Sequence, residues 1–315
     1  LQRETSTGNE LFFVASQNES GKNLTLDIDG DANVSADPFN NGGSLTVAST
    51  DANATVNLDS GVDGSALLNL AGDGSGTSKI VFDGSSAQTV TGEIFEFNAD
   101  SSDTGESVVE VSSTGGGVTV KGNIGSETNS VFSNFGSTAS AVDKVLVNGG
   151  GAFDDLTVEK NVNVGEIILD ASSNPASLTL GGSGEQSVTG AVNSAGATPA
   201  NTSIKVNNTS TGDEVAFNSA IGADTGKKVG TLAVTSGTAT LNADANFLSL
   251  VSVDSGHTLT NKADLTVIDG AGGGVLDVGG DLVNRENATI DIDGDVVDSG
   301  TITNEGLFAF YGPAQ

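Results

Sequence analysis

Residues 80–92 of the chain read IVFDGSSAQTVTG, and residues 178–190 read LTLGGSGEQSVTG. Gln88 corresponds to Gln186 at an offset of 98 residues, and the flanking glycines and the VTG triplet recur at that same offset. A second echo follows at an offset of 97, where residues 118–125 (VTVKGNIG) correspond to residues 215–222 (VAFNSAIG). Echoes at a fixed offset indicate an array of stacked units.

A third echo joins the two ends of the chain. Residues 26–31 read LDIDGD, and residues 290–295 read IDIDGD. Between these ends, the long period near 98 residues is divided into shorter units of roughly 20 residues, the length of one coil in a repeat protein.

Short strands are indicated throughout the chain. Runs of three to six residues, rich in β-branched side chains, are bounded by Gly, Asn, Asp or Ser, as expected of strands between turns. They lie at residues 24–28, 44–47, 79–82, 118–120, 144–147, 178–180, 204–206, 232–234 and 265–268. Helix formers other than Ala are scarce. The pattern therefore predicts an all-β protein.

Two all-β architectures fit this spacing. One is a β-solenoid, a parallel β-helix-like rod of short strands, and the other is a tandem of β-sandwich domains. Aromatic residues make up only 4% of the chain and Trp is absent. Since sandwich cores commonly depend on large aromatic anchors, the composition favours the solenoid.

The predicted organisation has three parts. Residues 1–43 form an N-terminal cap or first coils, residues 44–306 form the repeat array, and residues 307–315 form a C-terminal strand or cap.

The charge balance excludes two classes of partner. The chain has 41 acidic residues against 11 Lys and Arg, which gives a formal net charge of -30. A chain this acidic lacks the cationic face that nucleic acids and anionic membranes require. No apolar run approaches the roughly 18 residues that a membrane-spanning helix needs, so we expect no membrane span.

Three segments carry a family resemblance: residues 87–92 (AQTVTG), 215–222 (VAFNSAIG) and 232–241 (LAVTSGTATL). They resemble the repetitive passenger domains of bacterial autotransporters, the surface-layer-like proteins above all. The resemblance implies a secreted β-helix at the extracellular cell surface, with an adhesive or coat-forming role.

Two acidic clusters are candidate metal sites. Asp27, Asp29 and Asp31 alternate in sequence, and Asp291, Asp293 and Asp295 repeat the pattern. Alternate residues of one strand share a face, so each set would present three carboxylates together. Oxygen ligands of this kind suit Ca²⁺. The competing interpretation is that these aspartates are simply solvated.

Catalysis finds little support in the sequence. His257 is the one histidine and lies in a turn-like stretch, with no nucleophile motif beside it. A carbohydrate-binding or carbohydrate-degrading solenoid remains the alternative function, although a single Tyr and few basic residues leave little to hold a sugar. We therefore predict no catalytic residues and no enzyme activity.

Apolar residues cluster near both ends of the chain. Leu11, Phe12, Phe13 and Val14 lie near the start, and Leu307, Phe308, Phe310 and Tyr311 lie near the finish. Each end of a solenoid exposes an open strand edge that is either capped or paired with another molecule. These residues are therefore caps or assembly strands. The partners expected are other copies of the chain, joined head to tail, or cell-surface glycans.

Overall fold

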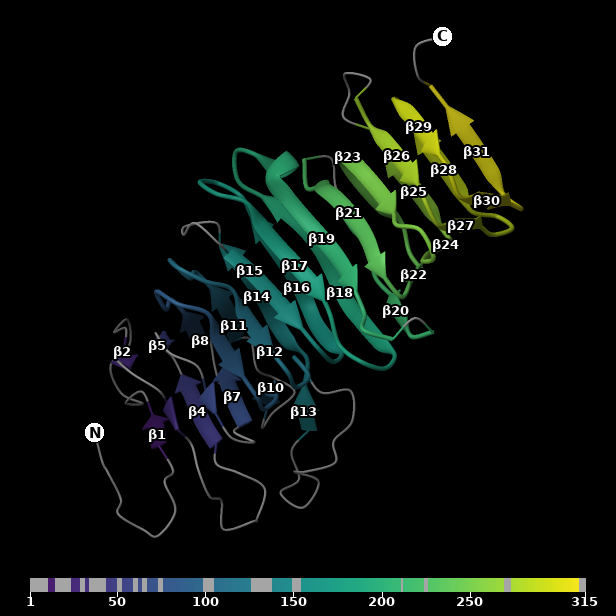
Figure 1. Cartoon of the computed structure of the whole chain (residues 1–315). Coiled ribbons are helices and arrows are strands. Elements are labelled where there is room, and N and C mark those ends of the chain that lie inside the picture. The colour runs from purple at the N-terminus through teal and green to yellow at the C-terminus, as the bar shows by residue number, and fades with distance from the viewer. Residues whose placement is uncertain are drawn as a thin grey trace. The chain divides into compact units, whose positions relative to one another are not determined.

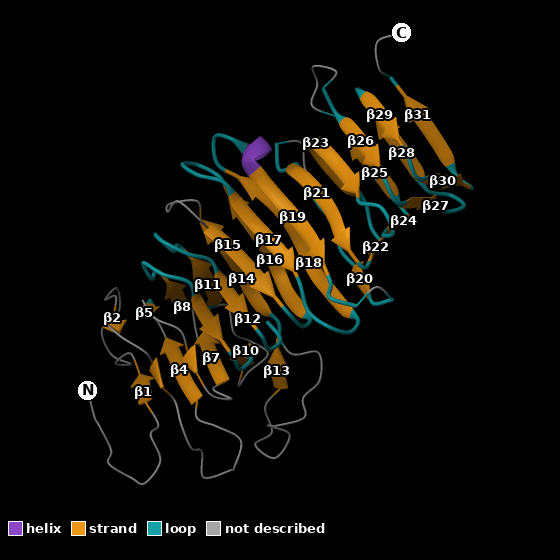
Figure 2. Ribbon diagram, in the orientation of Figure 1, coloured by secondary structure: helices purple, strands orange, loops and turns teal. Residues whose placement is uncertain are grey.

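The computed structural model describes residues 11–14, 24–28, 32–33, 44–49, 53–58, 62–63, 67–72, 76–98, 105–125, 138–148, 154–210, 212–223, 226–268 and 273–311. Contacts divide the chain into two compact units. Unit 1 holds residues 1–146 and 150–165, and unit 2 holds residues 147–149 and 166–315. Strands dominate both units (Figure 2), and η2 (Pro199–Asn201) is the one helical element among the described residues.

Unit 1 contains three series of stacked strands, and the chain visits the three in turn. The first series is β1 (Leu11–Val14), β4 (Ser44–Ser49), β7 (Leu67–Gly72) and β10 (Ile94–Asn98). The second is β2 (Leu24–Ile28), β5 (Ala54–Leu58), β8 (Thr77–Phe82), β11 (Glu106–Val111) and β14 (Val142–Asn148). The third is β3 (Ala32–Asn33), β6 (Val62–Asp63), β9 (Gln88–Val90), β12 (Val118–Val120) and β15 (Asp154–Val158).

Pairing within these series is parallel, with one exception. β13 (Thr138–Ser140) pairs with β10 in the antiparallel direction, through Glu96 and Ser140 at one of its ends. A strand that reverses direction cannot belong to the regular coil, so β13 interrupts the first series of unit 1.

Unit 2 has the same plan, and its strands are longer in the middle. β16 (Val162–Asp170) runs into it, and three series follow. The first is β17 (Ala176–Leu180), β19 (Thr202–Asn207), β21 (Val229–Ser236), β23 (Ala245–Val253), β26 (Val275–Val278) and β29 (Asp295–Asp298). The second is β18 (Gln186–Ala195), β20 (Glu214–Phe217), β22 (Thr238–Leu241), β24 (Thr258–Asn261), β27 (Asp281–Asn284) and β30 (Thr301–Asn304).

The third series of unit 2 begins at Val192 in β18, passes through the single residue Ile221 and reaches the N-terminal half of β23 at Ala245. It continues through β25 (Asp264–Val267), β28 (Thr289–Ile292) and β31 (Leu307–Phe310). Figure 1 shows β19, β21 and β23 side by side, as their parallel pairing requires.

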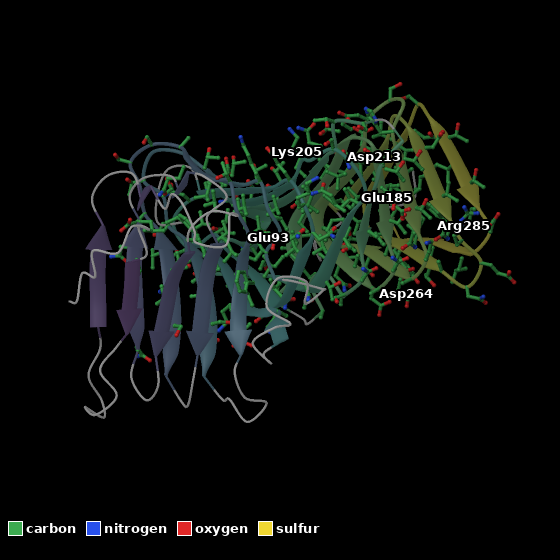
Figure 3. The ribbon with its side chains drawn as sticks, turned by 90° about the horizontal axis from the view of Figure 1, so that it is seen from below. Glu93, Glu185, Lys205, Asp213, Asp264 and Arg285 are labelled. Atoms are coloured by element: carbon green, nitrogen blue, oxygen red, sulfur yellow. The ribbon has the colours of Figure 1, made fainter. Side chains whose placement is uncertain are left out.

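The core of each unit consists of aliphatic ladders. In unit 2, Leu259, Leu282 and Ile302 align in successive strands, and so do Leu265 and Ile290. Side chains alternate between the two faces of a strand, so one residue in two joins such a ladder and its neighbours face outward. Lys205, Asp264 and Arg285 lie on the exterior (Figure 3), whereas Glu96 occupies an inward position.

The repeated glutamine is a turn element in both units. Gln88 is 1% exposed, its Oε1 accepts from the Gly84 N–H at 3.0 Å, and its Nε2 donates to the Leu58 carbonyl of the preceding coil at 2.7 Å. Gln186 accepts from the Gly182 N–H in the same way, at 3.4 Å. The 98-residue echo thus records one hydrogen-bonded turn used twice.

The second echo also has a structural meaning. Ile124 bridges Ile94 and Val162 as a single residue, and Ile221 bridges Val192 and Ala245. A glycine with positive φ follows each isoleucine: Gly125 at 70° and Gly222 at 61°. A Cβ at Gly125 would lie 1.7 Å from the Asn163 carbonyl oxygen, so that position requires glycine.

Coil length varies along the chain. Hydrogen bonds between neighbouring coils of unit 1 join residues 24 to 38 apart, as in Thr77 to Asn53 at 24, Gln88 to Leu58 at 30 and Asn161 to Asn123 at 38. Near the C-terminus the separation falls to 23 and then 20 residues. The expected unit of roughly 20 residues therefore describes the C-terminal coils, from the pairing of Thr238 with Thr258 onward, and not the whole array.

Parallel coils with inward aliphatic ladders make the protein a β-solenoid, as the sequence predicted. Tandem β-sandwiches are antiparallel, so the parallel registers decide against them. β1, β2 and β3 of the expected cap region pair directly with β4, β5 and β6. Among the described residues, no helix is both long and apolar enough to cross a bilayer.

Replacing Phe247 by Ala should test the ladder arrangement. Phe247 is 0% exposed within β23. We expect the variant to lose about 3–5 kcal/mol of unfolding free energy, because a large cavity opens in a thin core. Ser252→Ala, at an outward position of the same strand, should change it by less than about 0.5 kcal/mol. Urea unfolding followed by circular dichroism measures both, and equal effects would contradict the ladder.

Candidate functional site

The last coil of unit 2 is open on one side. It consists of β29, β30 and β31, which pair with β26, β27 and β28 respectively. Figure 1 shows β29 and β31 in yellow, at the C-terminal end of the chain. Within the described residues nothing pairs with the other edge of these strands. That edge therefore presents unpaired N–H and C=O groups in parallel strand geometry.

The exposed apolar side chains gather on this coil. Val297, Leu307, Phe310 and Tyr311 are the large apolar residues that are exposed in the described part of the chain. The other large apolar side chains of the described residues are buried or partly covered, and most of the aliphatic ones belong to the core. Exposed large apolar side chains are therefore concentrated on the last described coil.

The register explains why Phe310 is exposed. Phe308 aligns with Ile290 and Phe310 with Ile292, so both phenylalanines occupy inward, ladder positions. Ile290 and Ile292 are 0% exposed because β31 covers them, whereas Phe310 is 50% exposed. The difference is the absence of a covering strand over β31 among the described residues. A further coil would complete the ladder.

Asparagines form a second ladder that leads to the same end. Asn261 Nδ2 donates to Asn284 Oδ1 at 2.9 Å, and Asn284 Nδ2 donates to Asn304 Oδ1 at 2.8 Å. Asn261 and Asn284 are 0% exposed. Asn284 Nδ2 also donates to the Leu307 carbonyl oxygen at 3.1 Å, which joins β27 to β31.

This asparagine ladder has a direction. Every amide donates toward the next coil on the C-terminal side, and Asn261 Oδ1, at the other end, is buried with no hydrogen-bond partner. Asn304 is therefore the last member, and it is exposed. Its amide nitrogen extends the row toward the open side of the coil, where a backbone or side-chain oxygen would be its natural partner.

Acidic groups surround the open coil. Asp295, Asp298 and Glu305 are all exposed. Asp298 aligns with Val278 and Val253, so a carboxylate ends what is otherwise an aliphatic ladder. Glu305 pairs with Arg285 at 3.5 Å. A surface so charged repels a second surface of the same kind.

The proposed calcium ligands are only partly placed. Asp29 and Asp31, and the side chain of Asp27, lie outside the described residues. Asp291 belongs to β28 and Asp295 to β29, with a bend at Asp293 between them. The expectation that these three alternate along one strand is therefore wrong for this set. Among the described residues no group of three or more carboxylate or histidine side chains is arranged to hold a metal ion.

His257 has a structural partner. It lies in the expected turn, half buried, and its Nδ1 accepts from the Gly237 N–H at 3.2 Å. This bond joins the turn to the preceding coil, and it makes no use of acid–base chemistry.

Sequence reasoning missed a buried polar cluster in unit 1. Glu96 is 4% exposed at an inward position beside Leu70, and its Oε2 accepts from the Ser107 hydroxyl at 3.0 Å. Ser107 Oγ also lies 3.2 Å from Asp143 Oδ2. The residues come from β10, β11 and β14, so no local sequence signal links them. The sequence analysis also missed the asparagine ladder, although each of its three asparagines follows a short apolar run and the three recur at similar intervals along the chain.

The chain matches no protein-family model, and comparison with curated proteins and with solved structures finds no match. The resemblance to autotransporter passenger domains stays a prediction.

Asn284→Ala should lower the unfolding free energy by more than the small volume of the removed side chain would suggest. The change removes Asn284 Oδ1 and Nδ2 together. Asn261 Nδ2 keeps its bonds to the Ala263 and Thr289 carbonyls, but Asn304 Oδ1 and the Ala288 and Leu307 carbonyls lose Asn284 as a donor. We expect a loss of about 2–3 kcal/mol of unfolding free energy. Asn304→Ala removes one bond at an exposed position and should cost about 1 kcal/mol or less. Urea unfolding measures both losses. A larger loss for Asn304→Ala than for Asn284→Ala would contradict the ladder.

Proposed function

We propose that the chain is a structural or adhesive protein of the cell exterior, a β-solenoid that contributes to a surface coat, layer or filament. The open terminal coil carries this proposal. It combines unpaired strand edges with exposed apolar side chains on a chain whose other described surfaces are polar. Labelling of intact source cells with antibodies against the chain tests the location.

The stacked parallel strands suit assembly because the strand edges of each coil can pair with those of a further coil. Main-chain bonds of a parallel edge supply affinity, and inward side chains supply register. The chain needs no catalytic group for this role, and the proposal gives it no enzyme activity. The resemblance to autotransporter passenger domains supports the same location and the same kind of role.

Phe310→Asp combined with Tyr311→Asp should abolish assembly while the fold persists. Both side chains are exposed in the single chain, so the folded state loses little when they are replaced. Two charges on the docking surface would have to be desolvated on association. Sedimentation of concentrated protein should show large species for the native chain and only small ones for the variant.

The matched control is Thr231→Asp, on an outward position of an internal strand, which should assemble normally. Deletion of residues 307–315 separates docking from capping. Loss of assembly with unchanged melting supports docking, whereas melting of the last coils supports a cap.

Calcium belongs to the same proposal, through the segment Asp27–Asp31. A net charge of -30 opposes compaction, and bound divalent cations would relieve it. Chelation of Ca²⁺ at constant ionic strength should lower the melting temperature of the native chain.

Replacing Asp27, Asp29 and Asp31 by Asn should remove this sensitivity to chelator. Replacing Asp254, Asp264 and Asp281 by Asn is the control, and this variant should keep the sensitivity because these exposed carboxylates lie on separate elements of the fold. Melting that is identical with and without chelator in the native chain would show the aspartates to be solvated only.

A further inference from the structure

Three side chains from separate stretches of unit 2 meet around one carboxylate oxygen. Glu166 belongs to β16, Asn193 to β18, and Lys227 to the connection before β21. Asn193 Nδ2 donates to Glu166 Oε1 at 2.7 Å, and Lys227 Nζ lies 3.7 Å from the same oxygen. The side-chain amide and the ammonium group are thus held close to each other by their common partner.

The main chain also places Lys227 beside Asn193. The Ser194 N–H donates to the Lys227 carbonyl at 2.9 Å, and the Ser194 hydroxyl donates to the Lys228 carbonyl at 2.6 Å. The Lys227 side chain is 47% exposed, which leaves its stem room to move. Because this stem has four flexible carbons, the amine can turn from the carboxylate to the neighbouring amide carbon.

Asn193 is fixed at both ends of its amide. It is 4% exposed, its Oδ1 accepts from the Ala223 N–H at 3.2 Å, and its Nδ2 donates to Glu166. A backbone N–H at the carbonyl oxygen stabilises negative charge that develops there when Cγ is attacked. A carboxyl group at the amide nitrogen is placed to deliver a proton to it. The amide is therefore arranged for nucleophilic attack.

Unit 1 contains the same asparagine–glutamate bracket without an amine. Asn123 Nδ2 donates to Glu93 Oε1 at 2.7 Å, and Asn123 Oδ1 accepts from the Asn161 N–H at 3.1 Å. Among the described residues no lysine forms an ion pair with Glu93. An asparagine and a glutamate are thus enough to join neighbouring coils, and the lysine in unit 2 is an addition that the bracket does not need.

We propose that Lys227 and Asn193 form an isopeptide bond, with Glu166 as the acid–base group of the reaction. The bond between Lys227 Nζ and Asn193 Cγ forms, and the bond between Cγ and Nδ2 breaks. Lys227 enters as an ammonium group and keeps one proton in the new amide. Its other two protons pass by way of Glu166 to Nδ2, which leaves as an ammonium ion. Glu166 ends as the carboxylate that it was at the start, and no other reactant is consumed.

The bond supplies a covalent link between coils in a chain that contains no cysteine. Disulfides, the common covalent links of exported proteins, are closed to such a chain. Joining residues 193 and 227 restricts the unfolded chain and so favours the folded one, as a disulfide does. The modification goes beyond the proposed function and does not depend on it.

The intact mass of the full-length chain, measured after incubation at neutral pH, tests the bond. The native chain should be lighter than its sequence mass by one molecule of ammonia. Protease digestion should then release a branched peptide that joins the segments around Asn193 and Lys227. A succinimide at an asparagine also loses ammonia, but it gives no branched peptide.

Two variants should keep the full mass of their sequences. Lys227→Arg retains the positive charge and removes the amine. Glu166→Gln still offers an oxygen to Asn193 Nδ2, so it preserves the bracket, but it does not take up a proton from Lys227. Lys228→Arg is the matched control and should lose ammonia as the native chain does, because the Lys228 amine donates to the Ile268 carbonyl instead. Unchanged circular dichroism spectra show that the variants fold.

Three results would overturn the proposal. They are a native chain at its full sequence mass, a loss of ammonia with the branched peptide that persists in Lys227→Arg or Glu166→Gln, and a branched peptide that joins other residues. In the first case the three side chains form only a bracket, like that of Asn123 and Glu93. None of these results concerns assembly, so the proposed function stands or falls by its own experiments.

Discussion

Parallel pairing of one coil with the next is the interaction on which the rest of the structure depends. Each strand is short, between two and ten residues, and no single coil could bury its apolar face alone. Stacking in register satisfies the main chain and aligns the inward side chains in the same step. The described core is accordingly made of Val, Leu and Ile in rows, with only a few fully buried phenylalanines such as Phe82, Phe217 and Phe247.

Much of this arrangement could be read from the sequence, because its causes are local. Alternating apolar runs predict strands, and the echo around Gln88 and Gln186 predicts stacked units, which the parallel registers confirm; that the echo marks one hydrogen-bonded turn is visible only in the structure. Coil length was less predictable. Loops between coils are free to lengthen without disturbing the ladders, so a 30-residue coil in unit 1 and a 20-residue coil near the C-terminus share the same core.

In the candidate site, too, the features with local causes could be predicted from the sequence and the others could not. Phe308 and Phe310 lie on one face of β31, and this could be read from the sequence because it depends only on strand geometry. It failed for Asp291 and Asp295, because a bend at Asp293 divides them and bends depend on where the corner of the coil falls. Glu96, Ser107 and Asp143 come from three strands, and only the stacking of coils brings them together.

The asparagine ladder gives the array a polarity that aliphatic ladders lack. An aliphatic row presents the same surface at either end, so burial alone does not distinguish one docking direction from another. The amide row begins with a buried, unpartnered oxygen at Asn261 and ends with a nitrogen at Asn304. The two ends of the amide row therefore differ chemically, one presenting an acceptor and the other a donor. The order of coils along the chain is thus recorded in the direction of its hydrogen bonds as well as in the direction of its strands.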